Sequence, residues 1–400
     1  MPTRGVIFRT LLSQYGITSA IIRQLFSGGE MKPGRNHFFD ILRVVSVLFV
    51  ITSHYSYMFD TSSVLTFPRE YLTAGIGRLG VSFFFMISGA LAYLSLRKYA
   101  AGEYYLRRVY SVLIPYNIAY FGMALLLLAL SAFFIYPNNP LAEVGPSGSR
   151  SVLDMLPSVL GFDHYLHGVY EIKTVYFTGE WFIGCIILLY AISPLIYRAM
   201  VRYPMWTMLA TVAITLAAYD TRVTNPYWSA QVRISDFTFG MLFIHLQIQF
   251  TRYARPLALL AGLLITAGVT WAHLSHQTVR EVLFPLAPVS LLFAVAFFFI
   301  VQALYQLLHP WLSRPQVSQV LLSLASRAYI IMLLQHVVVI FLSANLDMSV
   351  LNATQAIALY LIVLVAIERL SVLFKPLAVK TERLLMSKTL RRNVRQLPTA

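Results

Sequence analysis

The chain has 400 residues, of which 58% are hydrophobic and only 12% are charged. A soluble domain of this length carries far more charge, so the composition excludes an ordinary soluble protein and predicts an integral membrane protein. The formal net charge of +15 would suggest nucleic acid in a soluble chain. Here the basic residues lie beside apolar stretches, where anionic lipid headgroups attract them, so we expect a lipid bilayer and no nucleic acid as partner.

The first 37 residues form a basic N-terminal arm. Arg4, Arg9 and Arg23 interrupt its apolar residues, whereas a removable signal peptide has a charged head followed by one continuous apolar core. The spacing of the apolar residues suggests a helix that lies on the membrane surface. A loose tail that precedes a second translation start at Met31 fits equally well, and the sequence leaves both open.

About ten stretches after the arm are apolar and long enough to cross roughly 30 Å of hydrocarbon. They cover residues 39–58, 79–96, 113–135, 180–197, 204–219, 234–250, 256–274, 282–305, 320–342 and 354–374. With the N-terminus inside, the inner segments hold 21 Lys and Arg and the outer loops hold seven. Because positive residues are retained in the cytoplasm, we expect both termini there. The predicted fold class is all-α: a polytopic membrane domain at 38–376, followed by a short basic tail at 377–400.

The longest gap between these stretches covers residues 136–179 and is expected to face outside. Its first part is rich in Pro, Gly and Ser, and its second part carries apolar residues. Long loops of this kind are usually functional or disordered. The second part is predicted either to dock on the outer face and line an acceptor cleft, or to be a plain connection.

The single cysteine, Cys185, lies inside a predicted span. One cysteine forms no disulfide framework and no cysteine-based metal site. We therefore expect no bound metal and interpret Cys185 as a small apolar residue.

Two ionisable residues lie in the first predicted span, where such groups are costly and often functional. Arg43 and His54 are eleven residues apart, which is about three helical turns plus 20°, so they share one helix face. A rise of about 1.5 Å per residue separates them by about 16 Å along the helix. Arg43 is thus expected near the cytoplasmic end and His54 near the outer end. Alternatively, each side chain only reaches toward the nearer headgroups.

The pair Arg43 and His54, with ten residues between them, resembles the first-span pattern of the acyltransferase-3 family of membrane-bound polysaccharide O-acyltransferases. Several later segments resemble features of that family in the same order: 80–89, Tyr105 to Arg108, Ile114-Pro115, Glu180 to Phe182, Arg233 to Phe237, Gly240-Met241 and Tyr329 to His336. The resemblance covers roughly residues 37–376. It implies transfer of an acyl group, commonly acetyl, from coenzyme A in the cytoplasm to a carbohydrate hydroxyl at or beyond the outer face.

The acyl-CoA is expected to be a co-substrate, with no tightly bound cofactor. Its phosphates need cationic partners, and the gap between the second and third spans supplies four: Arg97, Lys98, Arg107 and Arg108. Guanidinium and ammonium groups bind phosphate oxygens by charge-assisted hydrogen bonds. The alternative is that these residues only reflect the positive charge that cytoplasmic loops carry.

Several spans carry polar groups at a depth similar to that of His54, and together they predict a polar chamber that binds the acceptor. These residues are Arg78, Ser82, Glu180, Asp236 and His336. Glu180 is a candidate catalytic partner that orients His54, as an acid does for a general base. Its alternative role is a favourable acidic group at a helix N-terminus.

Histidine suits general base catalysis because its ordinary pKa of about 6.5 lets it accept and return a proton near neutral pH. We therefore predict that His54 activates the acceptor hydroxyl and that Arg43 positions the acyl-CoA. Direct attack on the thioester and a covalent acyl-histidine relay both remain open.

The predicted function is O-acyl transfer, of acetyl or succinyl, to a cell-envelope or exported polysaccharide or a lipid-linked oligosaccharide in the cytoplasmic membrane of a bacterium. Polysaccharide-synthesis proteins are possible partners. The alternative is a transporter or flippase of a sugar or lipid-linked intermediate, which would use the same buried Arg and His as a substrate or proton path. Many transporters contain two related halves, and no such repeat is visible here.

Overall fold

The computed structural model describes residues 37–59, 76–137, 139–144, 148–163, 166–167, 172–178, 181–219, 226–277, 282 and 290–395. These residues form helices joined by turns, without a strand. The N-terminal arm expected at residues 1–37 lies outside the described residues except for His37, which opens the first helix. The prediction of an all-α membrane protein is confirmed.

Eight helices of the described residues are long and apolar enough to cross a membrane. They are α3 (His37–Ser56), α5 (Gly77–Lys98), α6 (Ala101–Leu130), α10 (Trp181–Arg202), α14 (Ala254–Leu274), α16 (Ser290–Leu312), α18 (Ala328–Asn345) and α19 (Ala353–Arg395). Two further helices, α11 (Pro204–Tyr219) and α12 (Ala230–His245), have 16 residues each. Each of the ten predicted spans overlaps one of these helices.

Shorter helices connect or flank the long ones. They are α7 (Pro140–Glu143), α8 (Met155–Val159), α13 (Gln247–Arg252), α17 (Pro315–Ala325) and the 3-10 turns η2 (Val152–Asp154), η3 (Pro226–Trp228) and η4 (Met348–Val350). The span expected at 320–342 differs from the structure, because the chain breaks between α17 and α18 at Ser326 and Arg327. Arg327 binds Glu368 of α19 at 2.5 Å, so an ion pair that joins two helices accompanies this break.

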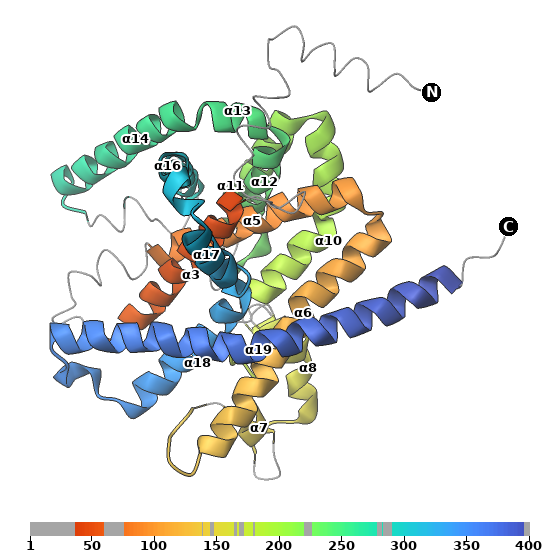
Figure 1. Cartoon of the computed structure of the whole chain (residues 1–400), viewed down its shortest axis with the longest axis vertical. Coiled ribbons are helices and arrows are strands. Elements are labelled where there is room, and N and C mark those ends of the chain that lie inside the picture. The colour runs from red at the N-terminus through yellow and green to blue at the C-terminus, as the bar shows by residue number, and fades with distance from the viewer. Residues whose placement is uncertain are drawn as a thin grey trace, which may run out of the picture.

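The last helix, α19, is much longer than the span predicted at 354–374. Its 43 residues extend for about 64 Å at about 1.5 Å per residue, roughly twice the hydrocarbon thickness. Figure 1 shows its C-terminal end reaching past the other helices. The helix continues through Pro376 and the basic tail, and it packs on α6 where Tyr110 Oη and Thr389 Oγ1 lie 2.8 Å apart.

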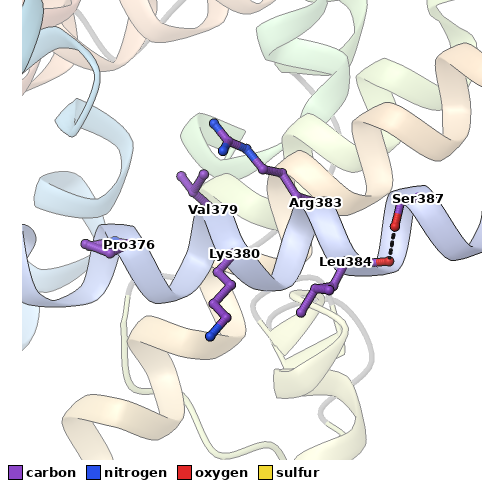
Figure 2. Close-up of a pocket in the computed structure, with 6 residues that line it drawn as sticks. All are labelled: Pro376, Val379, Lys380, Arg383, Leu384 and Ser387. Atoms are coloured by element: carbon purple, nitrogen blue, oxygen red, sulfur yellow. Dashed lines mark hydrogen bonds between the residues drawn. The ribbon is translucent and has the colours of Figure 1, made fainter.

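One face of this C-terminal half of α19 borders a hollow of about 570 Å³. Figure 2 shows the six residues that line it: Pro376, Val379, Lys380, Arg383, Leu384 and Ser387. Their spacing of three and four residues places them along one side of the helix. Two of the six, Lys380 and Arg383, are cationic.

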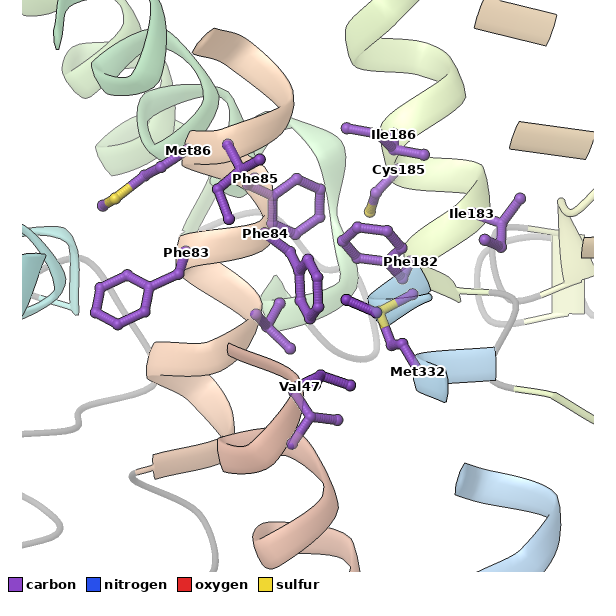
Figure 3. Packing of buried hydrophobic residues seen from close by; sticks show 14 of the residues in the cluster. Val47, Phe83, Phe84, Phe85, Met86, Phe182, Ile183, Cys185, Ile186 and Met332 are labelled. Carbon is purple, nitrogen blue, oxygen red and sulfur yellow. The ribbon is translucent and has the colours of Figure 1, made fainter. Parts of the chain in front are cut away.

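The core is built around α5, which packs against α3, α12, α10 and α16. Of three consecutive phenylalanines of α5, Phe83 points to one side of the helix, whereas Phe84 and Phe85 both contact Phe182 of α10 (Figure 3). Phe83 reaches Phe298 of α16 with ring centroids 6.4 Å apart, and Phe85 reaches Phe182 of α10 at 4.9 Å. An all-round apolar helix of this kind is a central one. By contrast, α14 exposes most of its leucines, as a peripheral helix facing lipid does.

Two glycines allow α5 and α12 to approach closely. A Cβ added to Gly89 would lie 1.8 Å from the backbone oxygen of Phe237, and one added to Gly240 would lie 1.8 Å from that of Met86. Small residues at such crossings let the backbones of membrane helices touch. The two helices are thereby locked in register.

Candidate active site

Helix α3 carries both residues of the first-span pattern. Arg43 lies near its N-terminus and His54 near its C-terminus. We use "His54 end" for the level of Ser56 on α3, Gly77 on α5 and Trp181 on α10. "Arg43 end" denotes the level of His37 on α3 and Lys98 on α5. The close approach of Gly77 to Ser53 confirms that the start of α5 lies beside the end of α3.

His54 lies beside a second histidine contributed by α18. The rings of His54 and His336 are 5.5 Å apart between centroids and meet edge to face. The preceding residue, Gln335, holds His54 directly, with its Oε1 2.8 Å from Nδ1. Two tyrosines lie next to the pair: the ring centroids of Tyr57 and His54 are 6.0 Å apart, and those of Tyr176 and His336 are 5.9 Å apart. The structure thus brings together two of the predicted site residues, His54 and His336.

A second polar cluster, which we call the arginine–aspartate cluster, comprises Ser82, Tyr227, Arg233 and Asp236. Arg233 Nη1 donates to Asp236 Oδ2 at 3.1 Å, and Ser82 Oγ donates to the same oxygen at 3.2 Å. Arg233 Nε donates to the backbone oxygen of Tyr227 at 3.1 Å. Arg233 and Asp236 are 2% and 3% exposed. These additional hydrogen bonds satisfy most of the polar atoms of this buried charge pair.

Two atoms of the arginine–aspartate cluster nevertheless have no hydrogen-bond partner among the described residues: Arg233 Nη2 and Asp236 Oδ1. Buried polar atoms are nearly always paired with protein or with water. The cluster therefore retains one donor and one acceptor for water or for a bound hydroxyl.

Tyr227 links this cluster to the remaining predicted residues at the His54 end. The guanidinium carbons of Arg233 and Arg78 lie 4.0 Å and 5.9 Å from the centre of its ring. Burial raises the pKa of Tyr227, the two arginines oppose this shift, and the phenol of Tyr57 adds to it. Tyr57 also contacts His54, so its phenol is close enough to influence Tyr227 and contacts one member of the histidine pair.

Glu180, the predicted partner of His54, lies outside the described residues. Its neighbour Trp181 opens α10 and packs on Tyr227 with ring centroids 5.3 Å apart. Among the described residues the hydrogen-bond partner of His54 is the neutral side chain of Gln335. A role for Glu180 stays a prediction.

At the other end of α3, Arg43 pairs with a residue one turn earlier. Its Nη1 lies 2.6 Å from Asp40 Oδ1. The Asp40 side chain is fully buried, whereas that of Arg43 is 24% exposed. Arg43 therefore compensates a buried carboxylate and still presents part of its guanidinium to the Arg43 end.

The four cations expected to bind acyl-CoA differ in their surroundings. Arg108 donates to the Leu91 backbone oxygen at 2.7 Å and to Ser95 Oγ at 2.5 Å, so it ties α6 to α5. Arg107 binds Glu103 at 2.6 Å and lies over the ring of Tyr99. Arg97 and Lys98 are exposed.

The same end of the molecule has further cations that the sequence analysis did not assign to donor binding. Arg107 Nη1 lies 3.7 Å from Met386 Sδ of α19, in the helix segment whose Lys380 and Arg383 line the hollow of Figure 2. The packing of α19 on α6 thus brings cations from both helices to one end of the molecule.

The loop between α6 and α10 packs on α6 and reaches the histidine pair. Tyr120 Oη donates to the Val175 backbone oxygen at 2.7 Å, and Tyr116 Oη donates to that of Ser158. These contacts hold the segment that contains Tyr176 against His336. The loop also exposes Leu153 and Leu156. The loop thus packs on the helices, and its lining of an acceptor cleft stays a prediction.

The loop contains a buried carboxyl group, Asp163. Burial raises the pKa of Asp163 to about 6, although hydrogen bonds to Thr174 and Ser158 oppose the shift. Ser158 Oγ donates to Asp163 Oδ1 at 2.9 Å and accepts from the Val175 amide at 3.1 Å. Asp163 therefore helps to hold the loop segment that contains Tyr176 in place.

Comparison with known proteins settles the family. A family model described as an acyltransferase domain matches residues 36–374 of the chain. The chain belongs to the acyltransferase-3 family. It is accordingly a membrane acyltransferase. No curated protein and no solved structure matches the chain.

Some residues that resemble this acyltransferase-3 family's motifs have a structural use here. Gly89 and Gly240 form the close crossing of α5 and α12. Arg233, which directly precedes the sixth predicted span, forms an ion pair with Asp236 at 3.1 Å. Other motif residues contact one another near a buried amide: His54 lies beside His336 and faces Gln335.

Sequence reasoning missed four residues of the site: Asp40, Gln335, Tyr227 and Tyr176. Asp40 had a local signal, since it lies three residues before Arg43 on the same helix. Gln335 had a weaker one, because an amide in a span needs a partner. The two tyrosines had none, because their roles depend on how distant segments pack. No group of three or more potential metal ligands occurs within the described part of the chain.

Proposed function

We propose that this membrane acyltransferase moves an acyl group, acetyl or succinyl, from cytoplasmic acyl-CoA to a hydroxyl of a cell-envelope or exported glycan on the opposite side. The observation that supports this most is the placement of residues on α3. One helix carries the partly exposed Arg43 at one end and, about 16 Å away along its axis, His54 beside His336 at the other.

The reaction needs a base because a sugar hydroxyl is a poor nucleophile until its proton is removed. His54 accepts the hydroxyl proton as the oxygen forms a bond to the thioester carbonyl carbon. The tetrahedral intermediate then collapses, the carbon–sulfur bond breaks, and the departing thiolate takes the proton from His54. The products are an O-acyl ester and free coenzyme A.

Donor binding is proposed at the Arg43 end. The phosphates of coenzyme A are held there by the exposed Arg97 and Lys98 of α5 and the half-buried Arg107 of α6, together with Lys380 and Arg383 of α19. Arg43 guides the acyl-bearing arm along the face that it shares with His54. Arg108 is assigned to holding α5 against α6 because its Nη2 donates to both the Leu91 backbone oxygen and Ser95 Oγ of α5.

Acceptor binding is proposed at the His54 end. Arg78, Ser82, Asp236 and the histidine pair lie there, and the arginine–aspartate cluster has a spare donor and a spare acceptor. A neutral sugar hydroxyl fits such a pair because it accepts from one group and donates to the other.

Direct transfer and a covalent acyl-histidine relay differ in one measurable way. A relay deposits the acyl group on His54 before any acceptor is present. Incubation of purified protein with isotopically labelled acetyl-CoA alone, followed by mass spectrometry of the His54 peptide, distinguishes them. We expect no acyl adduct if the hydroxyl attacks the thioester directly.

The main test of the proposed function is replacement of the base. His54→Ala should give a protein that inserts normally, with ester-linked acyl groups absent from the host's glycans. A matched control is His245→Ala, since His245 pairs with Tyr93 near the Arg43 end and should leave acylation intact. Normal acyl content in the His54→Ala strain would reject the proposal. Loss of glycan export with normal acyl content would favour a transporter instead.

A further inference from the structure

We infer that Gln335 is a positioning residue that fixes the tautomer of His54, with the proton on Nδ1 and Nε2 left as the base. The inference rests on the proposed role of His54. It adds Gln335 as a positioning residue and names Nε2 of His54 as the nitrogen that takes the hydroxyl proton.

The contact that carries the inference is short and buried. Gln335 is 2% exposed, and its Oε1 lies 2.8 Å from His54 Nδ1. An amide oxygen only accepts hydrogen bonds, so the nitrogen that faces it has to carry a hydrogen. A neutral imidazole has one N–H, and that hydrogen is then on Nδ1. Nε2 consequently has a free lone pair.

The rigid setting of Gln335 makes this contact effective. Gln335 lies in α18, which packs against α3, and its neighbours Leu334 and Val337 are fully buried. Because the amide has little freedom to rotate away, the ring of His54 is held in one orientation. Partners that orient metal-bound histidines typically change activity about 10-fold to 100-fold when removed, and we expect an effect of the same order at His54.

A neutral amide also differs from a carboxylate in what it does to charge. A carboxylate beside Nδ1 would stabilise the imidazolium that forms when Nε2 takes a proton. Gln335 provides a dipole but no charge, and a second imidazole, His336, lies 5.5 Å away. The charged form of His54 is therefore short-lived, which favours passing the proton promptly to the departing thiolate.

The first test is spectroscopic and needs no acceptor. Purified full-length protein labelled with [15N]histidine is compared with its His54→Ala variant, so that the missing signals identify the two nitrogens of His54. At neutral pH we expect Nδ1 to appear as a protonated, pyrrole-type nitrogen and Nε2 as an unprotonated, pyridine-type nitrogen. The opposite pattern would overturn the inference, even if His54 is the base.

The second test replaces Gln335. Gln335→Leu should lower kcat for acyl transfer to the host glycan by about 10-fold to 100-fold and leave the KM for acyl-CoA unchanged. Gln335→Glu should move the acidic limb of the pH–rate profile to higher pH, because a carboxylate stabilises the protonated ring. Gln302→Leu is the control: Gln302 is equally buried, lies in α16, and should leave both quantities unchanged.

The two tests separate the inference from the function it rests on. An active His54→Ala variant would reject the proposed function while the nitrogen spectrum still reports the tautomer. A folded Gln335→Leu protein with unchanged kcat and an unchanged His54 spectrum would reject the inference while leaving His54 as the base.

Discussion

At the scale of single residues, Arg43 has two roles: it neutralises a buried carboxylate, and it is proposed to bind the acyl-CoA. Asp40 is fully buried and 2.6 Å from Arg43. Any experiment that removes Arg43 therefore also leaves Asp40 without this cation. A loss of activity in such a variant has two explanations, instability and failure to bind the donor.

A double substitution separates these explanations. We expect Arg43→Gln to destabilise the protein by about 3 kcal/mol, the lower end for a broken buried pair, because Arg43 is partly exposed. The double variant Asp40→Asn/Arg43→Gln should recover most of this stability, measured as thermal unfolding in detergent. It should still turn over acyl-CoA poorly if Arg43 contacts the donor. Equal stability of Arg43→Gln and the unchanged protein would show that the ion pair contributes little.

The sequence predicted where Arg43 and His54 lie on α3, but not all of the residues that His54 contacts. The shared face of Arg43 and His54 follows from helix periodicity alone, which a single segment contains. The contacts of His54 with Gln335 and His336 cross from α3 to α18 and depend on tertiary packing. Asp236 was predicted in the same chamber as His54, yet its hydrogen bonds are to Ser82 and Arg233.

At the scale of helices and loops, the crossing of α5 and α12 makes a quantitative prediction. Gly89→Ala places a methyl group against the backbone oxygen of Phe237, and no rotation of a side chain relieves that clash. The helices must move apart, so we expect a loss of about 3 kcal/mol or more in the free energy of unfolding. Thermal unfolding of the purified variant measures the loss.

Gly262→Ala in α14 is the matched control for this substitution. Nothing lies within 4 Å of the added Cβ at this position. Since alanine favours a helix interior by about 1 kcal/mol over glycine, this variant should be as stable as the unchanged protein or slightly more so. Similar losses in both variants would show that the α5–α12 crossing is not specially tight.

The loop that carries Tyr176 is predicted to loosen as pH rises. Burial raises the pKa of Asp163 to about 6 in the folded protein, above its reference value of 3.8. The folded loop thus binds more protons than the unfolded one between these values, and its stability falls across that window. A shift of about two units corresponds to about 3 kcal/mol at most.

Hydrogen exchange of the loop amides at pH 5 and pH 8 measures this effect. In the unchanged protein, protection around Ser158 and Val175 should be weaker at pH 8. Asp163→Asn keeps an acceptor for Ser158 but has no carboxyl to ionise, so its protection should be similar at both values. A pH dependence that persists in Asp163→Asn would assign it to another group.

The positions of the helices were predictable because hydropathy and length are properties of a single segment. The helix ends were less predictable. α19 runs 21 residues beyond the predicted end at 374, since the helix extends to Arg395 and its charged residues favour helix in water. The break before α18 coincides with the ion pair of Arg327 and Glu368. A contact between distant residues of this kind leaves no periodic signal in either segment.

At the scale of the whole molecule, the proposed function requires that the two ends of α3 face opposite sides of the membrane. The basic residues carry this expectation, with 21 Lys and Arg in the segments predicted inside and seven in those predicted outside. Lys98 at the end of α5 and Leu153 in the loop before α10 are both exposed and are predicted on opposite sides.

Cysteine labelling tests this orientation, because the chain has a single, buried cysteine, Cys185. In a Cys185→Ala background, a membrane-impermeant maleimide added to intact cells should modify Leu153→Cys and leave Lys98→Cys unmodified. After permeabilisation, both positions should react, which shows that each is accessible. Labelling of Lys98→Cys alone in intact cells would show that the protein has the opposite orientation in the membrane. It would place Arg43 on the outer side, away from cytoplasmic acyl-CoA, and so contradict the assignment of donor and acceptor ends.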